Sequence, residues 1–127
     1  MAIPLCQILF TVDHHHTIYL MIELETIRRC FESNTVWYSH HARIEMRSEE
    51  FGPIDDEEVY QAICSGEMLE EYPDDTPYPS MLIFGKTKEN RPLHVVCAYN
   101  QLEEVVIIVT VYEPNPQFWV DFKRRRT

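Results

Sequence analysis

The stretch IDDEEVYQAICSGEMLEEY, residues 54–72, contains the point at which a helical pattern gives way to a strand pattern. Asp55 and Glu58 have the spacing of a capping box, in which two side chains each accept a hydrogen bond from the other residue's backbone at a helix start. Apolar residues then recur at helical spacing as far as Gly66, a residue type common just after a helix end. The sequence therefore predicts a helix over residues 55–65, whose first-turn acids suit the helix dipole without a catalytic role.

The residues on either side of this stretch complete the predicted fold. Helical spacing is also found over residues 21–33 and 39–50, with a short extended segment at 36–38 between them. Residues 67–72, 81–86, 93–99 and 105–112 have strand character, and the short turns between the later ones favour antiparallel neighbours. We therefore predict an α+β fold, with two or three N-terminal helices packed on one antiparallel sheet of three to five strands.

A chain of 127 residues has the length of a single domain. We assign residues 1–20 to an N-terminal arm of uncertain role, residues 21–122 to the α+β domain and residues 123–127 to a basic tail. The three consecutive histidines at 14–16 are interpreted as a polar turn, because neighbouring side chains on regular structure diverge and cannot share one metal ion.

The charge balance limits the function. With 11 Lys and Arg against 21 Asp and Glu, the net charge is −10. This excludes nucleic-acid binding by bulk charge, so any role on RNA requires a local basic site. The acids are concentrated over residues 45–75, where Arg47 is the one base. They form either a solvated face or a docking surface for a basic partner, and their spacing does not match a calcium loop.

Cofactors and membrane binding find no support in the sequence. The four cysteines are scattered without a CxxC pair, which argues against a zinc ribbon and a disulfide framework and favours reduced, mostly buried thiols in a cytoplasmic protein. No apolar run reaches the length of a membrane helix, about 20 residues. We expect no metal, no cofactor and no membrane partner.

Four residues are candidates for catalysis. His41, Arg43 and Arg47 lie on the predicted helix 39–50, and His94 lies on the predicted strand 93–99. Histidine can exchange a proton near neutral pH, and the planar guanidinium of arginine suits phosphate. The alternatives are structural: both arginines pair with neighbouring acids, including those of helix 55–65, and His94 is a packed histidine between apolar residues.

Three motifs carry a family resemblance. Ser39-x-His41-Ala42-Arg43 is followed by PLHVV at 92–96 and VTVYEP at 109–114. Over roughly residues 36–114 the chain resembles the bacterial family of domain of unknown function 4258. The resemblance implies a toxin-like domain similar to RelE- and barnase-type ribonucleases, with helices on a four-stranded antiparallel sheet and an antitoxin as partner. It singles out His41, Arg43, His94 and Thr110. The chain departs from the family pattern at Glu45, where relatives commonly have arginine.

Two functions follow as hypotheses. The first is a metal-independent endoribonuclease, or a descendant of one, in which His41 and His94 act as base and acid on RNA while Arg43 and Arg47 stabilise the phosphorane charge. The second is a non-catalytic acidic module that binds a basic protein partner through residues 49–75. Convergence of His41, Arg43 and His94 in an open cleft would favour the first, and burial of His94 with outward pairing of Arg43 the second. A homodimer remains open.

Overall fold

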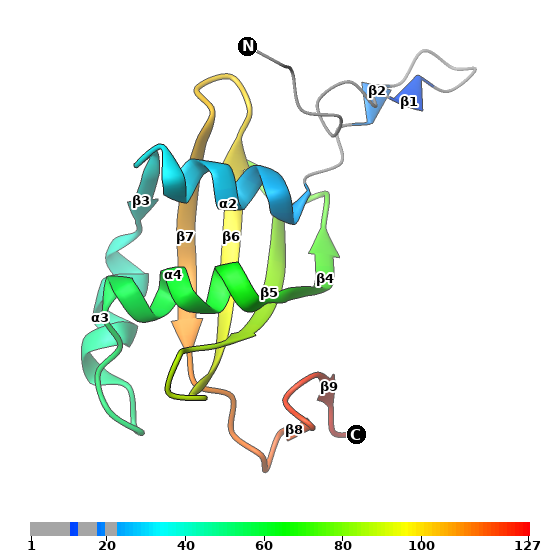
Figure 1. Cartoon of the computed structure of the whole chain (residues 1–127). Coiled ribbons are helices and arrows are strands. Elements are labelled where there is room, and N and C mark those ends of the chain that lie inside the picture. The colour runs from blue at the N-terminus through cyan, green and yellow to red at the C-terminus, as the bar shows by residue number, and fades with distance from the viewer. Residues whose placement is uncertain (1–10, 13–17, 20–22) are drawn as a thin grey trace.

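The computed structural model describes residues 11–12, 18–19 and 23–127 (Figure 1). Near the N-terminus, β1 (Thr11–Val12) pairs antiparallel with β2 (Ile18–Tyr19). The histidine run and most of the predicted arm lie outside the described residues. Residues 23–127 contain the remaining helices and strands.

Three helices come before the antiparallel strands of the main sheet along the chain: α2 (Leu24–Glu32), α3 (His40–Ser48) and α4 (Asp56–Ser65). Their ends lie within three residues of the predicted ones, so the three helix predictions are confirmed. Each helix buries a short apolar stripe of the kind that the spacing predicts. These stripes contain Ile27 and Cys30 on α2, Ala42 and Met46 on α3, and Val59, Ala62 and Ile63 on α4.

The start of α4 has the predicted capping box. The Asp55 carboxylate accepts a hydrogen bond from the Glu58 backbone at 2.8 Å, and the Glu58 carboxylate accepts one from the Asp55 backbone at 3.1 Å. Near its other end, α4 approaches the sheet so closely that a Cβ at Gly85 would lie 1.8 Å from the Ala62 carbonyl oxygen. Glycine at this position therefore allows the helix to pack directly on the sheet backbone.

The main sheet has five strands in the order β3-β7-β6-β5-β4. Their bounds are β3 (Val36–Tyr38), β4 (Glu67–Tyr72), β5 (Ser80–Lys86), β6 (Pro92–Asn100) and β7 (Val105–Tyr112). The predicted α+β class and strand number are confirmed, and β4 to β7 are antiparallel to their neighbours. The difference is β3, which pairs parallel to β7. Two helices and three strands separate β3 from β7 along the chain, so no tight turn fixes their relative direction.

The sheet has an inner face, covered by α2 and α4, and an outer face on the opposite side (Figure 1). Inner-face residues such as Val95, Cys97 and Val111 pack with the helices in the hydrophobic core. Side chains alternate along each strand, so His94 belongs to the outer face. After β7 a short hairpin of β8 (Trp119–Val120) and β9 (Arg124–Arg125) follows. Among the described residues, no helix combines the length and the apolar character needed to span a membrane.

Candidate functional site

Helix α3 carries three of the four predicted catalytic residues. Ser39 caps it by accepting a hydrogen bond from the Ala42 backbone at 3.0 Å. The side chain of His41, just inside the first turn, is 66% exposed, and its Nε2 lies 3.5 Å from Glu45 Oε1. Arg47 is exposed near the last turn. The exposed imidazole therefore lies beside a carboxylate on the next turn of the same helix.

Glu45 has a structural role that its sequence position does not reveal. Beyond the three residues that pair with β3, the edge of β7 faces α3. There the carboxylate of Glu45 accepts a hydrogen bond from the Val111 backbone at 3.1 Å, and Ser39 donates one to the Val109 carbonyl at 3.1 Å. Burial raises the pKa of Glu45 above its ordinary value. Glu45 therefore places a carboxylate on the sheet edge, where it satisfies a backbone donor.

Arg43 is committed to an intramolecular ion pair. Its guanidinium forms a two-pronged contact with the Asp56 carboxylate at the start of α4, with Nη2 to Oδ2 at 3.1 Å. The same group stacks 3.9 Å from the centre of the Tyr38 ring. The pairing with an acid of the third helix is the structural alternative considered from sequence. The Asp56 carboxylate thus occupies the two-pronged arrangement that a phosphate would use on this guanidinium.

His94 is fully enclosed on the outer face, with 0% of its surface exposed. Its Nε2 contacts the Phe122 carbonyl, which can only accept, so this nitrogen carries the hydrogen. Its Nδ1 then accepts from the Tyr112 hydroxyl at 3.0 Å. Trp119 packs edge-on against the imidazole, with the two ring centres 4.4 Å apart. Burial lowers the pKa of His94 below its usual value. His94 is thus a neutral, packed histidine.

The structure does not bring the four candidates into one open cleft. His41, Arg43 and Arg47 share α3, whereas His94 is sealed on the outer face by residues from β7 and the C-terminal hairpin. Thr110, which the family resemblance singled out, pairs with Val96 in the β6–β7 register, and Tyr112 is the residue opposite His94. Both geometrical criteria set out from the sequence therefore point away from a shared cleft.

The C-terminal hairpin contacts acids of β4 that the sequence did not single out individually. Lys123 Nζ lies 3.1 Å from Glu67, and the Arg125 guanidinium contacts both carboxylate oxygens of Glu70 at 3.2 and 3.4 Å. The Tyr72 hydroxyl donates to the same carboxylate, and the two contacts hold the pKa of Glu70 below its ordinary value. The sequence did contain a signal for this contact. It has an acid-rich strand and a basic tail in the same chain, and opposite charges attract each other.

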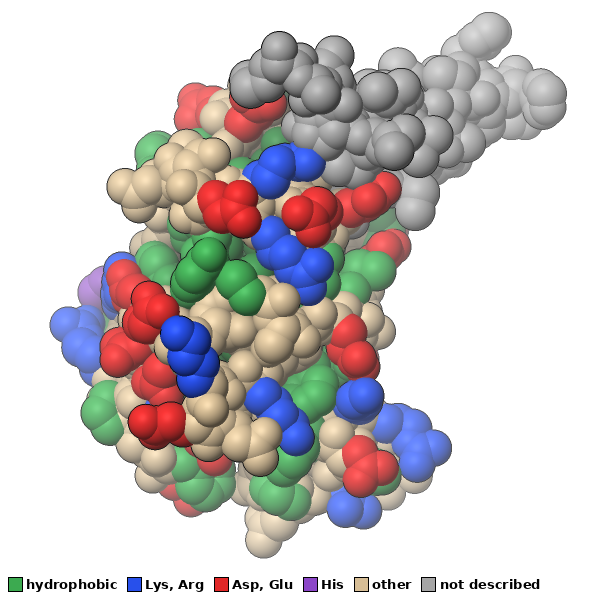
Figure 2. Space-filling view, in the orientation of Figure 1, with side chains coloured by type: hydrophobic (Ala, Val, Ile, Leu, Met, Phe, Trp, Pro, Cys, Tyr) green, Lys and Arg blue, Asp and Glu red, His purple; other side chains and the backbone are tan. Residues whose placement is uncertain are grey.

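The acids of residues 45–75 fall into two groups according to the elements that carry them. One group surrounds the α3–α4 connection, and the other follows β4 and the loop after it. Figure 2 shows Lys and Arg side chains gathered at the lower right, near β8 and β9. The first group comprises Glu45, Glu49, Glu50, Asp55, Asp56, Glu57 and Glu58, and the second Glu67, Glu70, Glu71, Asp74 and Asp75.

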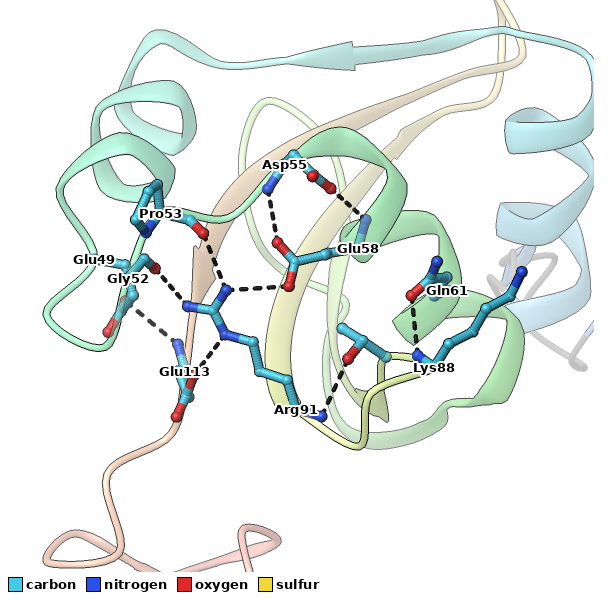
Figure 3. A network of polar contacts seen from close by, with 10 residues as sticks. Glu49, Gly52, Pro53, Asp55, Glu58, Gln61, Lys88, Arg91 and Glu113 are labelled. Carbon is cyan, nitrogen blue, oxygen red and sulfur yellow. Dashed lines mark hydrogen bonds and ion pairs between the residues drawn. The ribbon is translucent and has the colours of Figure 1, made fainter.

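Two acids, Glu58 of the first group and Glu113 after β7, neutralise Arg91 (Figure 3). Arg91 donates to Glu113 at 2.6 Å, to Glu58 at 3.1 Å and to the Pro53 carbonyl at 3.0 Å, and it also contacts the Gly52 carbonyl. One guanidinium thereby joins the α3–α4 loop, the start of α4 and the end of β7. Glu58 and Glu113 therefore contribute to holding the fold together.

The described residues include no group of three or more His, Cys, Asp or Glu side chains that could hold a metal ion. A family model described as Domain of unknown function (DUF4258) matches residues 38–113. No curated protein and no solved structure matches the chain.

Proposed function

We infer that this chain, which belongs to the DUF4258 family, is an interaction module that binds a basic segment of a partner protein through strand β4. Membership follows from the family match over more than half of the chain. The observation that carries the proposal is the docking of Lys123 and Arg125 on Glu67 and Glu70. Strand β4 already holds a basic segment, and that segment is the chain's own tail.

The position of β4 suits this role. It is an edge strand of the five-stranded sheet, so one side of it has no neighbouring strand among the described residues. Glu67 and Glu70 pair in register with Phe84 and Leu82 of β5, which places both acids on the outer face. The net charge of −10 adds a long-range attraction for basic partners and a repulsion for nucleic acid.

The placement of the candidate catalytic residues favours this role over RNA cleavage. Metal-free cleavage needs a base, an acid and cations that face the same phosphate. Here Arg43 is paired with Asp56, and His94 is buried with both ring nitrogens engaged. We also propose that the protein acts in the cytoplasm, where its unpaired thiols Cys30, Cys64 and Cys97 would remain reduced.

Charge reversal on β4 tests the proposed function. A fluorescein-labelled oligo-arginine peptide is titrated into the full chain while anisotropy is recorded. We expect saturable binding that weakens at least fivefold in Glu67→Lys with Glu70→Lys, because two attractive contacts become repulsive. The neutral pair Glu67→Gln with Glu70→Gln should weaken binding less, and circular dichroism confirms that each variant is folded.

The matched control is Glu50→Lys with Glu57→Lys, which changes the net charge equally in the other acidic group. We expect this control to bind within about twofold of the wild type, because a distant exposed charge is screened at physiological salt. Equal losses in the two charge-reversal pairs would mean that bulk charge rather than β4 attracts the peptide, which overturns the proposal.

RNA cleavage is the competing outcome. The full chain and His41→Ala are incubated with mixed-sequence single-stranded RNA in EDTA, and the products are examined for 2′,3′-cyclic phosphate ends. We expect neither protein to cleave. Cleavage by the wild type that disappears in His41→Ala would instead establish a nuclease and place His41 at its centre.

A further inference from the structure

We propose that the C-terminal hairpin, residues 117–126, is an intramolecular occupant of the binding site, and that the partner segment displacing it carries an aromatic side chain and an arginine. The proposal rests on the function inferred above and specifies the ligand of the same site. It also makes binding conditional on release of the hairpin.

The hairpin is an addition to the family domain. The family match ends at residue 113, and the chain then continues through Pro114-Asn115-Pro116 before β8 begins. Proline has no backbone N–H and a fixed φ, so this connection cannot continue the β7 hydrogen-bond ladder. The segment that seals His94 is therefore joined to the domain by a short linker outside the sheet.

The hairpin has little structure of its own to hold it in place. Strands β8 and β9 are two residues long, and a two-stranded hairpin is marginal in water even when it is longer. Its turn places Asp121 and Phe122 at φ of 52° and 63°, a left-handed conformation that a bulky residue such as phenylalanine rarely adopts. The hairpin therefore depends on its contacts with the sheet, and a ligand that makes the same contacts can replace it.

Those contacts define what the site recognises. Trp119 is 6% exposed, and its ring packs on His94 beside Tyr112 and Phe84. The Phe122 carbonyl accepts the hydrogen bond from His94, as any peptide carbonyl could. Arg125 binds Glu70 with two nitrogens and lies 4.7 Å from the centre of the Trp119 ring.

These three contacts together specify a peptide ligand. An aromatic cluster, the imidazole N–H of His94 and a carboxylate on one face match an aromatic side chain, a carbonyl and a guanidinium. Other residues of the hairpin are exposed and point away from the sheet. Phe118 is 64% exposed, and Arg124 is exposed. The chain thus provides both the occupying residues and their matched controls.

A tethered occupant competes at an effective concentration in the millimolar range, so a free peptide binds weakly until the tether loses its contacts. The test uses a labelled peptide with the sequence of residues 117–127 and three full-length proteins. These are the wild type, a released variant with Trp119→Ala and Arg125→Ala, and a control with Phe118→Ala and Arg124→Ala. We expect the released variant to bind the peptide at least tenfold more tightly than the other two.

The outcomes separate this inference from the proposed function. Equal affinity in all three proteins would overturn the role of the hairpin and leave β4 as a binding site. No binding of this peptide to the released variant, together with no oligo-arginine binding to any protein, would overturn both.

Two further measurements test the recognition itself. A peptide with Arg125→Glu should lose binding to the released variant and regain it when that variant also carries Glu70→Arg; failure of the rescue would contradict the assigned pairing. Sedimentation should show that the wild type is a monomer. A wild-type dimer that dissociates in the released variant would mean that the hairpin occupies a second copy, and would overturn the intramolecular arrangement.

Discussion

His94 shows how burial changes the chemistry that a residue type suggests. In an exposed position a histidine exchanges protons near neutral pH, whereas here its Nε2 donates to the Phe122 carbonyl and its Nδ1 accepts from Tyr112. The ring is neutral because burial opposes its charged form, and this is also why its pKa is lowered. A residue of catalytic type thus becomes the anchor for the C-terminal hairpin.

This lowered pKa predicts a loss of stability on mild acidification. Below about pH 6.5 the unfolded chain binds a proton at His94 that the folded chain does not yet bind. The free energy of unfolding should therefore fall by up to about 1.4 kcal/mol per pH unit from this group, until the folded His94 also protonates. The measurement is urea unfolding between about pH 5 and about pH 7.5, compared with His94→Gln.

His94→Gln can keep a donor toward Phe122 but does not titrate, so it should lack this part of the pH dependence. Glu70 does not confuse the comparison. Its hydrogen bond with Arg125 lowers its pKa, so its contribution to stability is lost only as the pH falls below the ordinary carboxyl value of 4.5. An identical slope in both proteins between about pH 5 and pH 6.5 would show that another group is responsible.

At the scale of elements, Arg91 is a side chain that connects several parts of the fold. It precedes β6 and contacts Glu58 on α4, Glu113 after β7 and two carbonyls of the α3–α4 loop (Figure 3). Its side chain is only 18% exposed. A partly buried guanidinium with several partners is worth more than an exposed ion pair, because its removal leaves acceptors without a donor.

Arg91→Ala should lower the free energy of unfolding by about 2–3 kcal/mol, since two carboxylates and two carbonyls lose their partner. Arg43→Ala is the matched comparison, because the Arg43–Asp56 pair is exposed on both sides. It should cost no more than about 1 kcal/mol. Urea denaturation of both variants measures the difference, and similar losses in the two would contradict the role assigned to Arg91.

The parallel pairing of β3 shows the limit of prediction at this scale. The pattern of residues 36–38 correctly indicates an extended segment, and the loops after Gly66 correctly indicate antiparallel neighbours. The partner of β3 is far away along the chain, however, and its direction depends on how α3 and α4 pack. Local periodicity fixes an element, whereas the pairing of a distant edge strand needs the packed core.

At the scale of the whole molecule, an acidic domain carries a basic extension on its outer face. If the hairpin is held only by these contacts, it should open without unfolding of the sheet. The amide of Arg126, which bonds to the Phe118 carbonyl, should then exchange hydrogen at least a hundredfold faster than the amides of β6. Hydrogen exchange followed by NMR measures both sets in one sample. Equal protection would mean that hairpin and sheet unfold as one unit.

The sequence by itself determined the helices, the strands of the antiparallel part, the capping box at Asp55 and Glu58, and the excess of acids. These features depend on neighbours within a few residues or on composition, so a linear pattern contains them. The sequence did not decide whether Arg43 pairs with an acid or stabilises a phosphate, nor whether His94 is packed or catalytic.

Only the tertiary structure decided the roles of Arg43 and His94, and only it revealed that the C-terminal hairpin contacts β4. Glu70 and Arg125 are 55 positions apart in the chain, and no period relates them. The environment of His94 likewise depends on Tyr112 and Phe122, which approach it once β7 has paired and the chain has turned back. Burial and charge pairing are properties of surfaces that meet in space, and so the candidate site was fixed by packing rather than by spacing.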